Sequence, residues 1–508
     1  MNLYQLFAET AQKRTDKPAI VFEEEAITFA QLPQRVARYA ASLARLGVTP
    51  GDRVAIQLGK CKEFVFLHLA NLSLGGVTLP LNSDYKPEEV QYFLSDSGAA
   101  LFVTDQNRYL NHRPALDALN VKSAIVDGSS REAVLGLPEV RPAAERGFSD
   151  VYPRHDDDLA LICYTSGTTG RSKGAMITHG NLISNMLDLQ EVWRWNDRDV
   201  LLHVLPLFHI HGLVVALHGS LNAGSTSVIH ERFDPARTWR ALERGRCTLL
   251  MGVPTMYQRL VAYWKKMEPR PDLSAIRLFI SGSAPLSTEL FHRFESATGF
   301  RILERYGMTE TGMIASNPYE PEGARKPGSV GFALPRVRMR IAGSDGTEAK
   351  PGDVGEVQLQ GPNVCRGYWG MPEKTREAFT DGWFRTGDLG YQDPADGMRL
   401  YLVGRGKELI ISGGYNVYPK EIEAVLDAHP AVLESAVLGV PDQDLGEQVV
   451  AFVVPRSGHE LPSGNALIAH CKAKLAGYKC PKKVLTIEEL PRNTMGKIQK
   501  DVLAGAVL

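Results

Sequence analysis

Residues 164–174 read Tyr-Thr-Ser-Gly-Thr-Thr-Gly-Arg-Ser-Lys-Gly, and no other stretch says as much about the fold. They include three glycines, five Ser or Thr hydroxyls and two cations, Arg171 and Lys173. The apolar run just before, at residues 159–164, predicts a strand. A glycine-rich segment after a strand can turn tightly and bring backbone N–H groups up to an anion. The composition therefore indicates a loop around the phosphates of a nucleotide, with a flexible surface loop as the alternative.

Helical and strand patterns alternate along the first 300 or so residues, which is typical of parallel α/β layers. Residues 325–403 instead show short alternating strands between Gly and Pro turns, which predicts a β-rich subdomain. The last hundred or so residues predict a compact α+β unit. Its expected helices lie at residues 420–428 and near 466–475, and its expected strands at 432–440 and 448–454.

Further motifs follow in order: YGMTE (306–310), TGD (386–388), GRGKE and SGGYNVYP (404–408 and 412–419), and PRNTMGK (491–497). Together with the glycine-rich stretch they resemble the signature segments of the adenylate-forming superfamily, which includes acyl-CoA synthetases, luciferases and peptide-synthetase adenylation domains. The resemblance spans nearly the whole chain. It implies a large N-terminal α/β domain over residues 1–404, a hinge at 405–407 and a small mobile C-terminal α+β domain over 408–508.

The overall composition is ordinary for a soluble globular protein. Hydrophobic residues make up 44% of the chain, charged residues 23%, and the net charge is −1, so no global field attracts nucleic acid. The six cysteines lack CxxC spacing, which argues against a zinc site or a disulfide framework. Residues 200–230 carry no Asp, Glu, Lys or Arg, but their apolar runs are short, which favours strand, loop and buried helix over a membrane anchor. The N-terminus resembles no targeting signal, and we expect a cytoplasmic protein.

The superfamily resemblance implies that ATP, Mg²⁺ and coenzyme A are used, with small molecules as the only partners. The residues expected to hold the β- and γ-phosphates are Thr165, Ser166, Gly167, Thr168, Thr169, Gly170 and Lys173. Those expected around adenine, ribose and the α-phosphate are Ser283, Ala284, Pro285, Glu304, Arg305, Tyr306, Gly307, Met308, Thr309, Asp388 and Arg405. Glu310 is the expected Mg²⁺ ligand, with Thr165 beside it, because Mg²⁺ accepts carboxylate and phosphate oxygens.

The same resemblance assigns catalysis to Lys497, Glu310, Thr309 and Lys173. Lys497 is expected to enter the site only while the acid is adenylated. The small domain then turns about Lys407 and presents Gly413, Gly414 and Tyr415 to coenzyme A. Lys497 would also be a target for an acyltransferase.

The residue before Tyr306 bears on which acid is activated. Long-chain members of the superfamily usually have a small residue there, whereas this chain has Arg305. A buried guanidinium needs an anion, and a substrate with a second carboxylate supplies one. The alternative is a pair between Arg305 and Glu304 or another acid. Ser283, His209 and Arg259 are further candidates for contact with the substrate carboxylate, and a metal pair of His209 and His211 lacks a third ligand.

Four segments, ERYGMTE, LPLFHIHGL, RLFISGSAPL and NVYPKEIE, resemble malonyl-CoA synthetases, including those that accept methylmalonate. We therefore expect an ATP-dependent dicarboxylate–CoA ligase. One alternative is a medium- or long-chain fatty acyl-CoA synthetase. A more remote one is an amino-acid-adenylating enzyme that loads a carrier protein. A nucleotide-binding regulator without catalysis would be expected to lose Lys497 or Glu310, and both are present.

Overall fold

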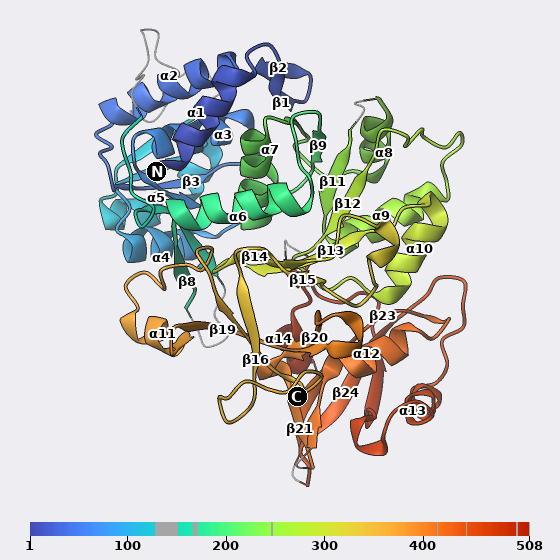
Figure 1. The fold of residues 1–508 in the computed structure, drawn as a ribbon. Coiled ribbons are helices and arrows are strands. Elements are labelled where there is room, and N and C mark those ends of the chain that lie inside the picture. Colours follow the sequence, from blue (N-terminus) through green and yellow to red (C-terminus); the bar gives the residue numbers. More distant parts are fainter. Residues whose placement is uncertain are drawn as a thin grey trace.

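Four β-sheets form the framework of the chain (Figure 1). The computed structural model describes residues 1–126, 151–165, 171–244, 247–413, 415–442, 444–493 and 496–506. Three sheets belong to a large N-terminal domain, and the fourth belongs to a small C-terminal domain that begins near residue 408. This mixed α/β architecture confirms the predicted fold class.

The first sheet has six strands in the order β6-β5-β3-β4-β7-β8. All neighbours pair in parallel except β7 and β8, which form an antiparallel pair on either side of the glycine-rich stretch. The strands are β3 (Arg53–Gln57), β4 (Val77–Pro80), β5 (Leu101–Thr104), β6 (Ser123–Ile125), β7 (Leu159–Thr165) and β8 (Lys173–Thr178). The accompanying helices are α1 (Leu3–Lys13), α2 (Gln31–Arg45), α3 (Lys62–Ser73), α4 (Pro87–Ser97) and α5 (Gln106–Leu119).

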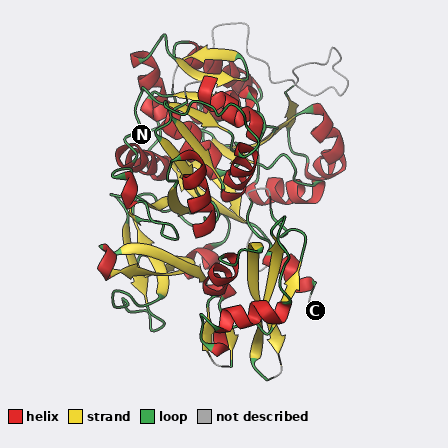
Figure 2. Cartoon of the chain, turned by 90° about the vertical axis from the view of Figure 1, so that its right-hand side faces the viewer, coloured by secondary structure: helices red, strands yellow, loops and turns green. Residues whose placement is uncertain are grey.

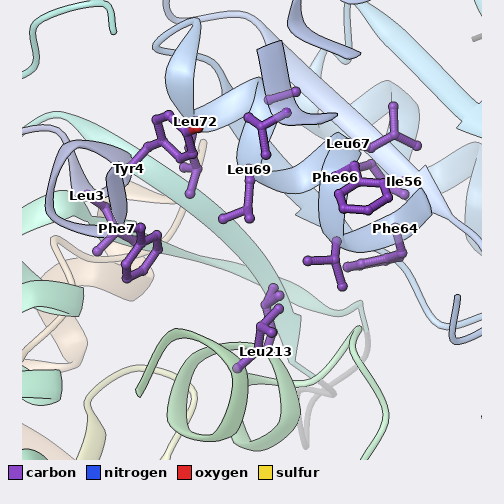
Figure 3. Packing of buried hydrophobic residues seen from close by; sticks show 14 of the residues in the cluster. Leu3, Tyr4, Phe7, Ile56, Phe64, Phe66, Leu67, Leu69, Leu72 and Leu213 are labelled. Atoms are coloured by element: carbon purple, nitrogen blue, oxygen red, sulfur yellow. The ribbon is translucent and has the colours of Figure 1, made fainter. Parts of the chain in front are cut away.

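Helix α3 is apolar on all sides and therefore lies inside the core rather than on its surface. Figure 3 shows side chains of one hydrophobic cluster, which includes Phe64 and Leu69 of α3, Phe7 of α1 and Leu213 from the second sheet's layer. Burying one such side chain stabilises the fold by about 1.5–3 kcal/mol. This core fixes the first sheet against the second.

The second sheet has nine strands in the order β15-β14-β13-β12-β11-β9-β10-β1-β2. Its central strands are parallel, so their carboxyl ends meet at one edge. The strands are β1 (Pro18–Phe22), β2 (Glu25–Thr28), β9 (Val200–His203), β10 (Thr226–Ile229), β11 (Leu249–Gly252), β12 (Leu278–Ser281), β13 (Leu303–Met308), β14 (Gly312–Ser316) and β15 (Phe332–Ala333). Its helices are α6 (His179–Val192), the π-helix η1 (His211–His218), α7 (Gly219–Ala223), α8 (Pro235–Arg244), α9 (Pro254–Trp264) and α10 (Thr288–Thr298).

The uncharged residues 200–230 form β9, a loop, buried η1 and α7, and β10, as predicted. No helix among the described residues is both long and apolar enough to cross a bilayer. The predicted β-rich subdomain is also confirmed, as an antiparallel sheet. It comprises β16 (Arg338–Ala342), β17 (Gly355–Gln360), β18 (Phe379–Thr380), β19 (Trp383–Asp393) and β20 (Arg399–Arg405), with α11 (Pro372–Glu377).

The small domain follows the short 3₁₀ helix η4 (Gly406–Glu408) and lies near the C-terminus marked in Figure 2. It has its own hydrophobic clusters, built from residue 410 onward. Its strands are β21 (Ile410–Ser412), β22 (Tyr415–Val417), β23 (Val432–Asp442), β24 (Gly446–Pro455) and β25 (Lys483–Thr486). Its helices are α12 (Pro419–Asp427), α13 (Gly464–Lys472) and α14 (Lys500–Gly505). Its core is therefore separate from the hydrophobic clusters of the large domain.

Candidate active site

A large open cleft of about 2210 Å³ lies between the two domains. One wall is formed by the carboxyl end of β13 and the loops after β9 and β12, and another comes from the small domain. Many of the predicted residues line it together: Thr165, His209, Ser283, Ala284, Pro285, Glu304, Arg305, Tyr306, Gly307, Met308, Thr309, Glu310, Asp388, Arg405 and Lys497.

Tyr306 and Asp388 join the second sheet to the β-rich subdomain at the cleft. The Tyr306 hydroxyl donates a short hydrogen bond to the Asp388 carboxylate, and burial raises the pKa of Tyr306 well above its usual value. Arg405 lies 3.3 Å from the other Asp388 oxygen. A planar aromatic ring beside a carboxylate with hydrogen-bonding capacity suits a nucleoside, whose base can stack and whose hydroxyls can donate.

Glu310 is buried and surrounded by oxygen groups. The Tyr368 hydroxyl donates to its carboxylate at 3.1 Å, and the Thr165 hydroxyl lies 3.4 Å away. Burial raises the pKa of the Glu310 carboxyl. Lys173 lies nearby, with its ammonium 4.7 Å from the Tyr368 ring. A carboxylate and hydroxyls beside a cation form a donor set that fits Mg²⁺ and phosphate oxygens.

Lys497 lines the cleft from the small domain, where its carbonyl accepts the Asn493 N–H at 2.9 Å. The Lys497 N–H donates to the Asn493 side chain at 3.0 Å, and Arg492 donates to the Gly496 carbonyl at 2.7 Å. Gly496 has φ +76°, and a Cβ there would lie 2.9 Å from the Thr255 hydroxyl of α9. Burial and the nearby Arg405 lower the pKa of Lys497. The turn that carries this lysine is therefore packed directly on the large domain.

Arg305 points away from Tyr306, because successive side chains of a strand face opposite ways. It is only 3% exposed, and its Nε and Nη2 have no hydrogen-bond partner among the described residues. Gly282 leaves the space that the guanidinium fills, since a Cβ there would lie 2.3 Å from Cζ of Arg305. Burial lowers the pKa of Arg305 to about 9, so the group stays charged at neutral pH. It is a buried cation without an ion-pair partner in the part of the chain that the structure describes.

The neighbouring Glu304 does not neutralise this charge by an ion pair. One carboxyl oxygen of Glu304 accepts the Leu286 N–H at 2.9 Å, and the other has no partner among the described residues. Burial raises the pKa of Glu304 to about 7. The alternative in which Arg305 pairs with Glu304 therefore finds no support in the geometry.

Two buried histidines, His209 and His211, lie near Arg305 in the lining of the cleft. Burial, together with the nearby Arg305 charge, lowers the pKa values of His209 and His211. The pKa of His209 falls to about 4. His211 Nδ1 lies 3.1 Å from the Ser283 hydroxyl, and Ser283 has a left-handed φ of 69°. Both rings are thus neutral at physiological pH, and they offer hydrogen bonds without adding charge.

Arg259 is not brought to the cleft. Its guanidinium lies over the Phe233 ring at 5.0 Å, on the exposed face of α9. Tyr257, Leu260 and Val261 form the buried face of that helix, and Arg259 falls opposite to it.

Two further predicted residues lie in or next to the small domain. Lys407 is exposed in η4, while Tyr415 is 58% exposed and stacks on Tyr478.

Several predicted positions lie outside the described residues, namely Ser166, Gly167, Thr168, Thr169, Gly170 and Gly414. Gly413 lies at the end of β21, away from the residues that line the cleft. Two residues beside the site, His211 and Tyr368, were not among the predicted contacts. Each is identified only by its hydrogen-bond partner. Ser283 lies 72 positions from His211, and Glu310 lies 58 positions from Tyr368.

Comparison with known proteins gives the family. The model for AMP-binding enzymes matches residues 7–369, and the model for the AMP-binding enzyme C-terminal domain matches residues 421–497. The mitochondrial malonate–CoA ligase of Mus musculus is 37% identical over 96% of this chain and 88% of its own length. A feruloyl-CoA synthase of Streptomyces sp is 38% identical over 94% of this chain and 93% of its own. The acids in these names differ at similar identity, so the comparisons leave the acid open.

Solved structures agree with the fold. The ATP-bound crystal structure of MatB from Rhodopseudomonas palustris has a TM-score of 0.89 and 43% identity, covering 100% of this chain and 99% of that one. The apo structure of the same protein, at the same coverage and 42% identity, has a TM-score of 0.81. The structure described here is thus more similar overall to the ATP-bound structure than to the apo structure.

The buried Glu304 carboxyl, with one oxygen unpartnered among the described residues, leads to a prediction about how folding stability depends on pH. The pKa of Glu304 is about 7 in the folded protein against an ordinary value of 4.5, so its contribution to stability is fully present below about pH 4.5 and is lost as pH rises through 7. Relative to a Glu304→Gln variant, the wild type should gain about 3 kcal/mol between pH 8 and 4.5. Thermal unfolding midpoints of both proteins across this range check it. Parallel pH profiles would show that Glu304 titrates normally.

Proposed function

The chain belongs to the AMP-binding enzyme family, and we propose that this ATP-dependent acid–thiol ligase joins a small dicarboxylic acid, malonate or its homologue methylmalonate, to coenzyme A. One observation carries the proposal. The Arg305 guanidinium lies buried in the cleft, charged, with two nitrogens that have no partner among the described residues.

An unpaired buried charge costs several kcal/mol, and a carboxylate that binds it relieves much of that cost. A guanidinium can hold a carboxylate through two parallel hydrogen bonds. An uncharged acyl chain in the same place would leave Arg305 unpaired and would meet polar groups of Ser283 and His209 instead of an apolar wall. A short acid with a carboxylate at each end fits this chemistry better than a fatty acid.

In the proposed first step the near carboxylate of the acid attacks the α-phosphorus of ATP, and pyrophosphate leaves. Arg305 holds the far carboxylate, while Thr309 donates to the α-phosphate. Glu310 and Thr165 would hold Mg²⁺, which when bound neutralises phosphate charge. Lys497 orients the attacking carboxylate and the phosphate by charge-assisted hydrogen bonds. These groups mainly position and neutralise, which is how such a site accelerates transfer.

In the proposed second step the thiol of coenzyme A attacks the acyl carbonyl, AMP leaves and the thiol proton passes to solvent. We propose that residues 1–404 and 408–508 move as two bodies about a hinge at 405–407, with Lys407 at its centre. This rotation would remove Lys497 and bring Gly413, Gly414 and Tyr415 to the acyl-adenylate. The separate core of the small domain supports such a movement.

Lys497→Ala should abolish adenylation and spare the second step. The lost contact is charge-assisted and partly buried, so the rate of acid-dependent pyrophosphate exchange should fall by roughly 10²–10³. Thioester formation from supplied acyl-adenylate should stay within about twofold of wild type. An equal loss in both half-reactions would refute the assignment of Lys497 to adenylation alone.

Lys407→Pro should separate the half-reactions in another way. Proline fixes φ near −65°, a value that suits the 3₁₀ helix η4 in which Lys407 lies. The variant should therefore keep the described orientation, retaining pyrophosphate exchange while losing thioester formation. If both half-reactions proceed at wild-type rates, the hinge lies elsewhere.

Arg305→Ala tests the substrate. Removing a buried partner of the far carboxylate costs about 3–5 kcal/mol, so kcat/KM with malonate should fall by roughly 10²–10³. Activity with butyrate, which lacks the second charge, should hold steady or rise, because the change removes a buried cation and opens space.

Arg259→Ala is the matched control, since this arginine lies on the exposed face of α9. It should leave both activities unchanged. Equal losses of malonate and butyrate activity in Arg305→Ala would make Arg305 a structural residue. A wild type that prefers long fatty acids would replace the dicarboxylate proposal with the fatty-acyl alternative.

A further inference from the structure

A second contact between the domains lies away from the catalytic turn. Arg456, which follows β24 of the small domain, contacts Glu289 of the large domain with 2.5 Å between Nη2 and Oε1. Glu289 lies in the first turn of α10, where a negative charge is favoured by the helix dipole. Arg293, one turn later, lies 3.6 Å from the same oxygen. In Figure 1 the small domain lies directly below α10.

Both partners of this ion pair are held in place. Arg456 donates to the Pro430 carbonyl at 2.8 Å and to the Val432 carbonyl at 2.7 Å, so its guanidinium is fixed within the small domain. The side chains are only 18% and 26% exposed. Asp427 also faces the pair, but burial and nearby carboxylates raise its pKa to about 8, so it is mostly protonated at neutral pH. An ordered, partly buried pair of this kind contributes more than a mobile surface pair.

Arg456 and the turn that carries Lys497 both belong to the small domain, and both contact the large domain. Gly496, next to Lys497, packs on Thr255, while Arg456 meets Glu289 on the neighbouring helix. A rotation about residues 405–407 that withdraws Lys497 must also separate Arg456 from Glu289. We propose that the Arg456–Glu289 ion pair is an interdomain latch, which favours the adenylating orientation and must open before the thioester is formed. This inference rests on the two-step function proposed above, but not on which acid is used.

The test compares the two half-reactions in Glu289→Gln, a nearly isosteric change that removes only the charge. Pyrophosphate exchange should fall by roughly five- to thirtyfold, the range expected for one charge-assisted contact. Thioester formation from supplied acyl-adenylate should be unchanged or faster, because the latch no longer opposes rotation. Arg456→Gln should act alike, and the double variant should be no worse than either single one, because the two residues act as one pair.

Glu295→Gln is the matched control. Glu295 lies on the same helix and pairs with Arg301 at 2.6 Å, but both residues belong to the large domain. It should change neither half-reaction. Equal loss in both half-reactions for Glu289→Gln, or no change in either, overturns the latch. If malonate is not a substrate of the wild type, the proposed acid fails separately, and the latch is measured with whichever acid the wild type activates.

Discussion

The structure around Arg305 is constrained by a buried guanidinium that has no counter-ion among the described residues. A charge held away from water is costly, and proteins normally pair it. Here the surroundings leave Arg305 room but no partner among the described residues. Gly282 lacks the Cβ that would collide with it, and Glu304 directs one carboxyl oxygen to a backbone N–H. His209 and His211 remain neutral beside it. The missing anion is therefore expected from the substrate.

The other end of the cleft depends on the meeting of four sheets. Thr165 comes from the first sheet, Glu310 from the turn after β13, Asp388 from the β-rich subdomain and Lys497 from the small domain. The first three belong to the large domain. Lys497 belongs to the small domain, and its position in the cleft depends on the interdomain contacts of Gly496 and of the Arg456–Glu289 pair. In the proposed two-step reaction, nucleotide binding by the large domain would therefore be separable from the presence of Lys497.

Most of the predicted site residues that the structure describes line the cleft, because each motif is short and local. Arg305, Tyr306 and Glu310 lie within one strand and its turn, so finding the strand places all three. Arg259 shows where prediction from residue chemistry fails. Its charge suggested a place in the pocket, but Tyr257 and Leu260 form the buried face of α9, so Arg259 lies on the outer face. His211, Tyr368 and the Arg456–Glu289 pair depend on contacts between distant segments, which spacing along one chain does not encode.

The most direct test of the Arg305 interaction uses the wild type with malonate and its monomethyl ester. The two acids share the reacting carboxylate, and at the far end the ester has an uncharged methyl ester in place of the second carboxylate. If Arg305 binds the second carboxylate, kcat/KM should be at least roughly 10²-fold higher for malonate than for the ester. Similar kcat/KM values for both would contradict this role and show that the buried guanidinium serves the fold rather than the choice of substrate.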